Sequence, residues 1–479
     1  MIKQNFQQPP NIKLLINIGA GLDIPTGQYV KGKHGESVLL GGLGPVTAVV
    51  GRGNMFKSTI LHFMKLSAMN RIFSTVATSS NTYDTEVNIQ ETSLERFITR
   101  FEYLYPLDIL SSGIWLITDK TVYYANKWYE DLKDFLKEKM KMAKDYTVET
   151  PFLSRDRANT LKVVVPTFSE LDSFSEFETE DVAEMQNKNE LGDSGGNTIH
   201  MRQGLAKTRF LMDVPNLFGS SNNYLLMTAH MGTDIQVATS PYAAPPAKVL
   251  QHMKQGEKIK GVTGKFFFLM NNCWHAYRAS VMINKDTKGP IYPRNVKENT
   301  IRDTDLNLVS MLQMRSKFGQ SGYTLDLIVS QTEGVLPSLT EYHYIKENDY
   351  FGFGGSDRGH YLELLPDVSL SRTTVRGKID SDAKLRRALN ITSELCQMHQ
   401  YYRYMADILC TPKELYEGLI KLGYDWNFIL EKTRGWWCFD DKKNPLLFLS
   451  TLDLVNIYRG TYVPYWMNDD KSVKKEYQH

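Results

Sequence analysis

The sequence predicts an α/β protein with a mostly parallel sheet flanked by helices, followed by a smaller, mainly helical region. Apolar runs of strand length alternate with stretches of helical apolar spacing along most of the chain. A glycine-rich turn at residues 51–58 separates a buried-type strand from a helix. After about Pro366 the pattern changes to successive helices with clustered aromatic residues. We therefore expect an N-terminal segment at 1–44, a core at 45–365 and a C-terminal helical region at 366–479.

The composition is that of a globular protein. The chain has 479 residues, of which 42% are hydrophobic and 23% charged, and its formal net charge is +2. This charge gives no global argument for nucleic acid, so any basic surface must be local. No signal-peptide-like stretch and no run of roughly 18 apolar residues occurs, so we expect no membrane segment and a cytoplasmic location. The four cysteines lack zinc-site spacing and are expected to be buried reduced thiols.

The expected elements of the core follow from apolar periodicity and length. Strands are expected at residues 46–50, 72–77, 114–118, 168–171, 224–228, 264–270 and 323–330. Helices are expected at 58–69, 94–105, 127–144 and 203–217, and beyond the core at 381–407 and 411–423. Residues 176–197 and 233–264 are expected to be long loops, a class of segment that is often functional. An insertion, residues 150–165, precedes the strand at 168–171.

The turn at residues 51–58 has the pattern G-x-x-x-x-G-K-S, except that Phe56 replaces the second glycine. In such a loop, backbone N–H groups and the following helix N-terminus hold phosphates. Lys57 would reach the β- and γ-phosphates of ATP, and the Ser58 hydroxyl would bind Mg²⁺. The alternative is a structural turn with a solvated lysine. The expected nucleotide contacts are Gly51, Arg52, Gly53, Asn54, Met55, Phe56, Lys57, Ser58 and Thr59.

These residues resemble a known family. Phe-Lys-Ser at 56–58 is similar to the phosphate loop of UvsX-like phage recombinases, which are RecA-type P-loop ATPases. Tyr83-Asp-Thr-Glu86 resembles that family's Y-D-S-E. The resemblance implies a RecA-like core in which Glu86 is the general base, a role that suits a carboxylate facing water in line with the γ-phosphate. The alternative for Glu86 is an exposed acid in a turn.

Two strand ends extend the resemblance. Residues 168–173 resemble the Walker B ending I-D-S, which implies that Asp172 binds Mg²⁺ together with Ser58. Ser169 and Glu170 interrupt a run that is usually apolar, so the register stays open, and a helix-capping role for Asp172 is the alternative. Residues 224–230 resemble the family's A-I-N-H, which implies that His230 senses the γ-phosphate. A strand-end histidine without a catalytic role is the alternative.

A basic pair further along the chain resembles the family's K-S-R segment. Arg315 and Lys317 stand before the last expected strand of the core, where RecA-type and DnaB-type assemblies place cations that reach the neighbouring subunit's ATP. Such a cation stabilises charge on the transferring phosphoryl group. The order here is Arg-x-Lys, so the identity of the acting residue stays open. Solvated charges before a strand are the alternative.

The two expected loops stand where RecA-type proteins contact DNA. The loop at 233–264 carries lysines that can neutralise phosphates without reading sequence. The loop at 176–197 is acidic in its first half and a poorer DNA ligand. A soluble loop without DNA contacts is the alternative. The expected DNA-binding residues are Lys248, Lys254, Lys258 and Lys260.

The resemblance therefore implies a strand-exchange recombinase that binds single-stranded DNA, forms a homo-oligomeric helical filament and hydrolyses ATP at subunit interfaces, in the host cytoplasm if the source is a phage. One alternative is a DnaB-type replicative helicase, a hexameric ring, because residues 315–322 are similar to that family's K-x-R-x-G-x-x-G. Another is a nucleotide-bound structural or regulatory module with little turnover. Phe56 and the irregular run at 168–172 favour this last reading.

Overall fold

The computed structural model describes residues 13–154, 159–188, 196–233, 248–300, 304–356 and 359–478. Six strands of the central sheet run parallel: β3 (Val46–Gly51), β4 (Ser80–Asp84), β5 (Trp115–Asp119), β8 (Thr167–Asp172), β9 (Asn223–Thr233) and β11 (Asn272–Val281). Four antiparallel strands complete it: β10 (Glu257–Ile259), β12 (Leu306–Ser316), β13 (Thr324–Ser330) and β14 (Gly334–Val335). The predicted α/β class with a mostly parallel sheet is confirmed.

The strand order is β14-β13-β12-β11-β3-β9-β8-β4-β5, with β10 paired to the end of β9. The chain leaves β3 toward β4 on one side, whereas β11 flanks β3 on the other side. The order therefore reverses beside β3, and ligands of open α/β sheets bind outside the carboxyl ends of the strands at such a point. The register brings these ends together, because Gly51 pairs with His230 and Asp84 pairs with Asp172.

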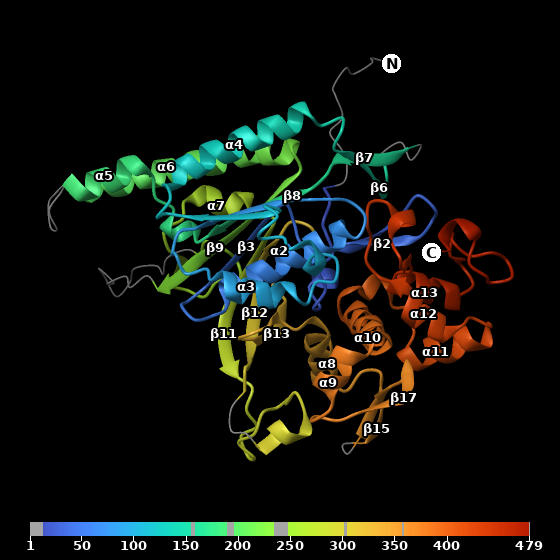
Figure 1. The fold of residues 1–479 in the computed structure, drawn as a ribbon. Coiled ribbons are helices and arrows are strands. Elements are labelled where there is room, and N and C mark those ends of the chain that lie inside the picture. Colours follow the sequence, from blue (N-terminus) through green and yellow to red (C-terminus); the bar gives the residue numbers. More distant parts are fainter. Residues whose placement is uncertain are drawn as a thin grey trace.

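Helices cover both faces of the sheet (Figure 1). The face toward which Val49 points carries α2 (Lys57–Phe73), α3 (Glu91–Ile98) and α8 (Pro337–Glu347). The face of Ala48 and Val50 carries α4 (Ala125–Lys141), α6 (Gly196–Ser220) and α7 (Gly264–Leu269). This alternation along β3 follows from the two-residue period of a strand, and it accounts for an apolar run that is buried on both sides.

Three expectations are wrong. Residues 72–77 are the end of α2 and a turn, because Ile72 continues the buried helical stripe. Residues 264–270 form α7 rather than a strand: Phe266 enters the core and Phe268 is exposed. The strand of this region is β11, which the sequence pattern did not reveal because it contains Asn, His and Arg.

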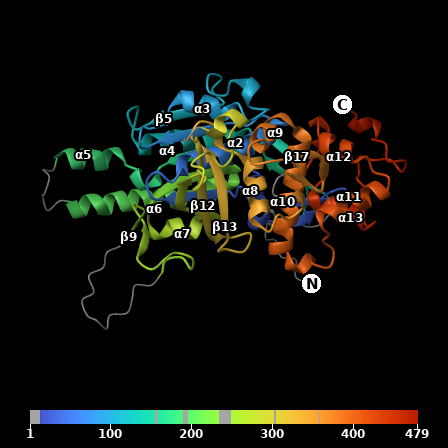
Figure 2. The ribbon, with the colours of Figure 1, turned by 90° about the horizontal axis from the view of Figure 1, so that it is seen from below.

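The expected loop at 176–197 contains α5 (Glu180–Lys188), which packs on α6 and extends away from the sheet (Figure 2). Residues 189–195 and 234–247 of the two expected loops lie outside the described residues.

Smaller elements surround the sheet. The expected insertion is the hairpin β6 (Thr147–Leu153) and β7 (Thr160–Val164). Before β3 lie α1 (Asp23–Thr26), β1 (Gln28–Lys31) and β2 (Ser37–Leu40), and after α8 lie β15 (Phe353–Ser356), β16 (Gly359–Leu362) and β17 (Leu365–Leu370). Short 3-10 turns are Tyr105–Leu107, Phe174–Glu176, Val296–Thr300, Arg403–Met405, Asp441–Lys443 and Lys475–Tyr477.

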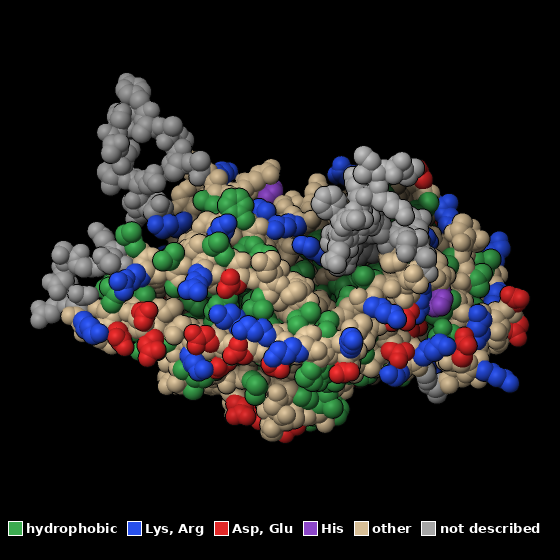
Figure 3. All heavy atoms as spheres, turned by 90° about the horizontal axis from the view of Figure 1, so that it is seen from above, with side chains coloured by type: hydrophobic (Ala, Val, Ile, Leu, Met, Phe, Trp, Pro, Cys, Tyr) green, Lys and Arg blue, Asp and Glu red, His purple; other side chains and the backbone are tan. Residues whose placement is uncertain are grey.

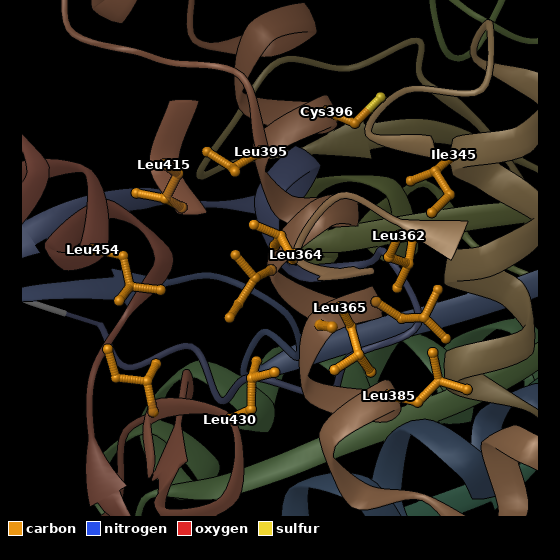
Figure 4. Close-up of a cluster of buried hydrophobic side chains, with 14 of the residues drawn as sticks. Ile345, Leu362, Leu364, Leu365, Leu385, Leu395, Cys396, Leu415, Leu430 and Leu454 are labelled. Carbon is orange, nitrogen blue, oxygen red and sulfur yellow. The ribbon is translucent and has the colours of Figure 1, made fainter. Parts of the chain in front are cut away.

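The C-terminal region is helical, as expected. It contains α9 (Val375–Ser381), α10 (Ala383–Tyr401), α11 (Pro412–Lys421), α12 (Trp426–Lys432) and α13 (Thr451–Tyr458), with the short strands β18 (Thr433–Arg434) and β19 (Leu447–Phe448). Asp382, Thr411, Asp425 and Ser450 cap four of these helices through their side chains. Aliphatic side chains of α8, β16 and these helices form one buried cluster, shown in Figure 4. Ile24 and Leu39 join it from the N-terminal segment.

The surface over α4 mixes charges of both signs, as Figure 3 shows from above. Ion pairs within α4 contribute to this mixture, for example Lys127 with Asp131 at 2.8 Å and Lys137 with Asp134 at 3.0 Å. The four cysteines are all buried, which confirms that expectation. Among the described residues no helix has both the length and the apolar character that crossing a membrane requires.

Candidate functional site

The turn between β3 and α2 holds Phe56, at the position of the replaced glycine, in a conformation that glycine favours. Phe56 precedes α2 with φ 55° and ψ 26°, the left-handed region that glycine favours. Asn54 has a similar φ of 58°. A side chain at Gly51 would meet the Ala276 carbonyl oxygen at 2.7 Å, so the first glycine is needed for close packing. The predicted order of strand, turn and helix is therefore present.

Lys57 lies at the centre of this loop. Its side chain is buried, and Nζ donates a hydrogen bond to the Arg52 carbonyl oxygen at 2.9 Å, across the turn. Burial lowers the pKa of Lys57, whereas the nearby carboxylates of Asp172 and Glu86 act in the opposite direction. The lysine is thus held by its own loop between two acidic side chains. A bound phosphate could replace the backbone oxygen as its partner.

Asp172 ends β8 beside the start of α2. The Thr228 hydroxyl of β9 donates to its Oδ1. Burial raises the pKa of Asp172, and the hydroxyls of Ser58 and Thr228 lower it. Its Oδ2 is buried and accepts no hydrogen bond of standard length from any described residue. The predicted pair of Ser58 and Asp172 is therefore assembled, with one carboxylate oxygen left for a further partner.

Glu86 and His230 meet at the same edge of the sheet. His230 Nε2 lies 2.7 Å from Glu86 Oε1, and both side chains are about one third exposed, at 28% and 31%. Glu86 belongs to a loop folded around Asp84, whose carboxylate accepts the backbone N–H groups of residues 86–89 at 2.8 to 2.9 Å. Asp84 therefore positions Glu86. The sequence signal for it was an Asp at a strand end before a turn.

A second missed residue, Lys207, connects the segments after the strands. The His230 N–H donates to Ser175 Oγ at 2.9 Å, and Ser175 Oγ donates to the Lys260 carbonyl at 2.9 Å. Lys207 Nζ of α6 donates to the carbonyls of Ser175 and Gly261, at 2.6 and 2.9 Å. Burial lowers the pKa of Lys207 to about 8. A lone lysine in a long helix gave no signal of this role, because its partners are remote in sequence.

A cavity of about 950 Å³ runs along α2 from Thr59. One wall comes from α3 and the residues after it, including Phe97 and Arg100, and the other from residues 332–339 before and within α8. Charged side chains line its far part. Arg376 of α9 makes a double hydrogen bond to Asp305, at 2.9 and 3.0 Å. This cavity was not anticipated, since its walls are built from segments more than 200 residues apart.

Arg315 and Lys317 lie at the other edge of the sheet. Arg315 pairs with Cys273 at the start of β11, whereas the phosphate loop follows the end of β3. Arg315 Nε donates to the Met270 carbonyl at 3.3 Å, and Lys317 Nζ donates to that of Phe268 at 2.6 Å. Burial lowers the pKa of Lys317. Both cations thus lie at the end of the sheet opposite the turn at residues 51–58.

The four expected DNA-binding lysines, Lys248, Lys254, Lys258 and Lys260, are exposed. Lys258 is in β10, and Lys260 follows it. Since β10 pairs with the end of β9, they lie near His230 at the carboxyl edge of the sheet. Lys248 and Lys254 follow residues 234–247, which are outside the described part of the chain.

The residues around Asp172 fit a magnesium ion held mainly by a nucleotide. In the described part of the chain no three His, Cys, Asp or Glu side chains are grouped as a complete metal site. Mg²⁺ is typically bound by one or two carboxylates together with phosphates and water, and the free Oδ2 of Asp172 beside Ser58 suits that mode. The chain matches no protein-family model, and no curated protein matches its sequence significantly.

Proposed function

We propose that this chain is a RecA-type, DNA-dependent ATPase that binds single-stranded DNA and acts as a recombinase, hydrolysing ATP at subunit interfaces. One observation carries the proposal. Five side chains selected from the sequence for one reaction, listed at the end of this paragraph, converge at the carboxyl ends of β3, β4, β8 and β9. They come from four segments spread over some 170 residues, so nearness in the sequence does not explain why they lie together. The five are Lys57, Ser58, Glu86, Asp172 and His230.

ATP would lie with its phosphates at the N-terminus of α2 and its nucleoside in the cavity that begins at Thr59. Lys57 would exchange its bond to the Arg52 carbonyl for a phosphate oxygen. Ser58 and Asp172 would hold Mg²⁺, which neutralises charge on the phosphoryl group when bound. The helix N-terminus and the lysine supply the remaining positive charge.

Glu86 would take the proton of the attacking water. Its carboxylate is partly exposed, so water reaches it, and Asp84 fixes the loop that carries it. His230 contacts Glu86 Oε1 and, through its backbone, the network of Ser175, Lys260 and Lys207. A change in the Glu86–His230 contact would therefore be transmitted to β10 and its exposed lysines. This connection supports coupling between hydrolysis and DNA binding.

The position of Arg315 and Lys317 supports assembly. Because they lie at the opposite edge from their own phosphate loop, they can assist hydrolysis only in a neighbouring copy. A helical filament and a hexameric ring both meet this condition. The DnaB-type alternative differs in the geometry of the assembly, not in the site. The third candidate is a nucleotide-bound module with little turnover. Binding of ATP without hydrolysis, at a loop that holds Phe56 in the left-handed conformation, would favour it.

The test is ATP hydrolysis with and without single-stranded DNA, comparing the wild type with Lys57→Ala. We expect DNA to stimulate hydrolysis and the variant to lose about 10²- to 10³-fold in rate, the cost of removing one charge-stabilising donor. Lys137→Ala is the matched control, since Lys137 is exposed on α4 and pairs with Asp134 of the same helix. Binding without DNA-stimulated hydrolysis would refute both DNA-ATPase readings. If DNA stimulates hydrolysis, imaging of the DNA-bound assembly would distinguish a filament from a ring.

A further inference from the structure

Strand β8 carries two buried carboxylates that point to the same face. Glu170 and Asp172 are two residues apart, so both side chains face α2. Asp172 belongs to the proposed magnesium site. No hydrogen bond or ion pair of the described residues joins Glu170 to Ser58 or Lys57, yet Glu170 is fully buried in a strand of which every residue is buried. Its position within the Walker B segment requires a physical explanation.

Glu170 is held by two basic side chains of α2. Lys65 Nζ contacts Oε2, and His62 Nδ1 lies 2.7 Å from Oε1. Thr82 Oγ1 of β4 donates to Oε2 at 2.9 Å. Lys65 and His62 thus approach the two oxygens of this carboxylate separately. The three side chains form a charged group without access to solvent.

The group also occupies a defined position on the helix. Ser58, His62 and Lys65 follow one another at spacings of four and three residues, so they share one side of α2. Helix α2 and strand β8 thus meet at two adjacent levels. Ser58 faces Asp172 at the first, and His62 with Lys65 faces Glu170 at the second.

The surroundings make this arrangement rigid. Lys65 Nζ lies 3.6 Å from the centre of the Trp115 ring and donates to Thr82 Oγ1 at 2.9 Å. Trp115 Nε1 donates to the same hydroxyl at 2.8 Å. A slide or rotation of α2 against β8 would leave a buried charge without its partner, which is strongly unfavourable. The pairing therefore fixes the register of the helix that begins with Lys57 and Ser58.

We propose that Glu170 is a positioning residue for the magnesium site: through His62 and Lys65 it holds α2 so that Ser58 stays against Asp172. The proposal rests on the proposed ATP-binding function. It differs from a purely structural role in one measurable respect. Glu170 sets the concentration of Mg²⁺ that nucleotide binding needs, and not only the stability of the core.

The test is an equilibrium titration of the full chain with a fluorescent ATP analogue at increasing Mg²⁺. The main variant is Lys65→Met with Glu170→Leu, which removes both charges and keeps similar volumes, a type of change that folded cores tolerate. We expect an unfolding temperature near that of the wild type and a half-saturating Mg²⁺ concentration about 10- to 100-fold higher, the effect of removing an outer partner of a metal ligand. Binding of the analogue without Mg²⁺ is expected to stay unchanged.

Two further variants complete the design. Glu170→Asp keeps the charge but retracts the carboxylate, and it is expected to raise the Mg²⁺ requirement in the same direction by a smaller factor, even if the double variant fails to fold. Lys139→Met is the control. Lys139 is a buried lysine that donates to Thr167 of the same strand at 2.9 Å but lies on α4, against the other face of the sheet. It should leave the Mg²⁺ dependence unchanged.

The outcomes separate this proposal from the function on which it rests. If the wild type and Lys139→Met bind the analogue but the Glu170 variants show the wild-type Mg²⁺ dependence, the positioning role is overturned and the proposed function stands. An equal rise in Lys139→Met would also overturn it, because any loss of a buried charge would then suffice. If the wild type binds no analogue at any Mg²⁺ concentration, both proposals fall.

Discussion

The carboxyl edge of the sheet and the C-terminal helical region differ in the kind of side chain that they bury. At the sheet edge the buried groups are charged: Asp172 Oδ2 has no standard hydrogen bond within the described chain, and Lys57 donates to the Arg52 carbonyl of its own loop. In the C-terminal region aliphatic side chains fill the core (Figure 4), and side chains cap four helices. The first arrangement leaves charged groups beside the strand ends for a ligand. The second is dominated by apolar contacts, although Arg387 Nε and Asp453 Oδ2 are also buried there without a hydrogen-bond partner in the described chain.

This difference indicates which buried groups contribute to stability and which are available to a ligand. Unpartnered buried polar atoms cost free energy, so a fold keeps them only where something else compensates. Buried aliphatic side chains stabilise the fold directly by removing apolar area from water. We therefore expect substitutions at the sheet edge to change nucleotide chemistry with little effect on stability, and substitutions in the helical core to do the reverse.

The largest expected effect is at Glu86. Glu86→Gln removes the proposed base but keeps the size of the side chain, so we expect the rate of ATP hydrolysis to fall by about 10²- to 10⁴-fold. Nucleotide affinity and the unfolding free energy should change little, because the side chain is partly exposed. Steady-state kinetics, nucleotide binding and denaturant unfolding check this. A variant that hydrolyses ATP at the wild-type rate would show that Glu86 is only a turn acid.

In the helical core, Leu395→Ala is expected to act on stability alone. Leu395 of α10 is fully buried in the aliphatic cluster, and its truncation leaves a cavity that costs about 2–5 kcal/mol of unfolding free energy. The KM for ATP should stay near the wild-type value. Urea unfolding measures the first and ATPase kinetics the second, with Leu422→Ala as the exposed control. A large change in KM would break the proposed separation of the two regions.

Glu341 sharpens the comparison because it is an acid buried beside the helical core. Burial raises its pKa from 4.5 to about 8, and the neighbouring Glu394 adds to the shift. The folded state then holds a proton that the unfolded state releases between pH 4.5 and 8, so this group's contribution to stability falls with rising pH, by up to about 1.4 kcal/mol per unit. Glu341→Gln should therefore be more stable relative to the wild type at pH 8 than at pH 5. Unfolding at both values measures this, and a constant difference would contradict it.

The smallest expected effect concerns Phe56. At an ordinary helix position glycine is less stable than alanine, but the left-handed φ of residue 56 penalises every side chain. We expect Phe56→Gly to exceed Phe56→Ala in unfolding free energy by about 1 kcal/mol. Both variants lose the packing of the phenyl ring, so this loss cancels in the difference between their unfolding free energies. The usual order, with alanine the more stable, would show that the loop relaxes away from the left-handed conformation.

Local patterns were enough to predict the α/β class, the turn between β3 and α2 and the helices of the C-terminal region. The strand–turn–helix around residues 51–58 is encoded within one short segment, and so is the amphipathic helix α4. Local sequence patterns gave the wrong element where tertiary contacts override local preference. The apolar run at 264–270 forms a short helix that buries Phe266 and leaves Phe268 exposed, whereas β11 is a strand despite its polar residues because β3 and β12 flank it.

The sequence by itself determined which residues are candidates for the proposed nucleotide site, since Lys57, Ser58, Glu86, Asp172 and His230 stand out by type and local setting. Only the tertiary structure decided that they meet, because strand order and register bring Gly51 beside His230 and Asp84 beside Asp172. It also decided the role of Glu170, which looked like a defect in a strand. Its partners His62 and Lys65 are about 100 residues away, and a buried carboxylate is interpretable only once the side chains around it are known.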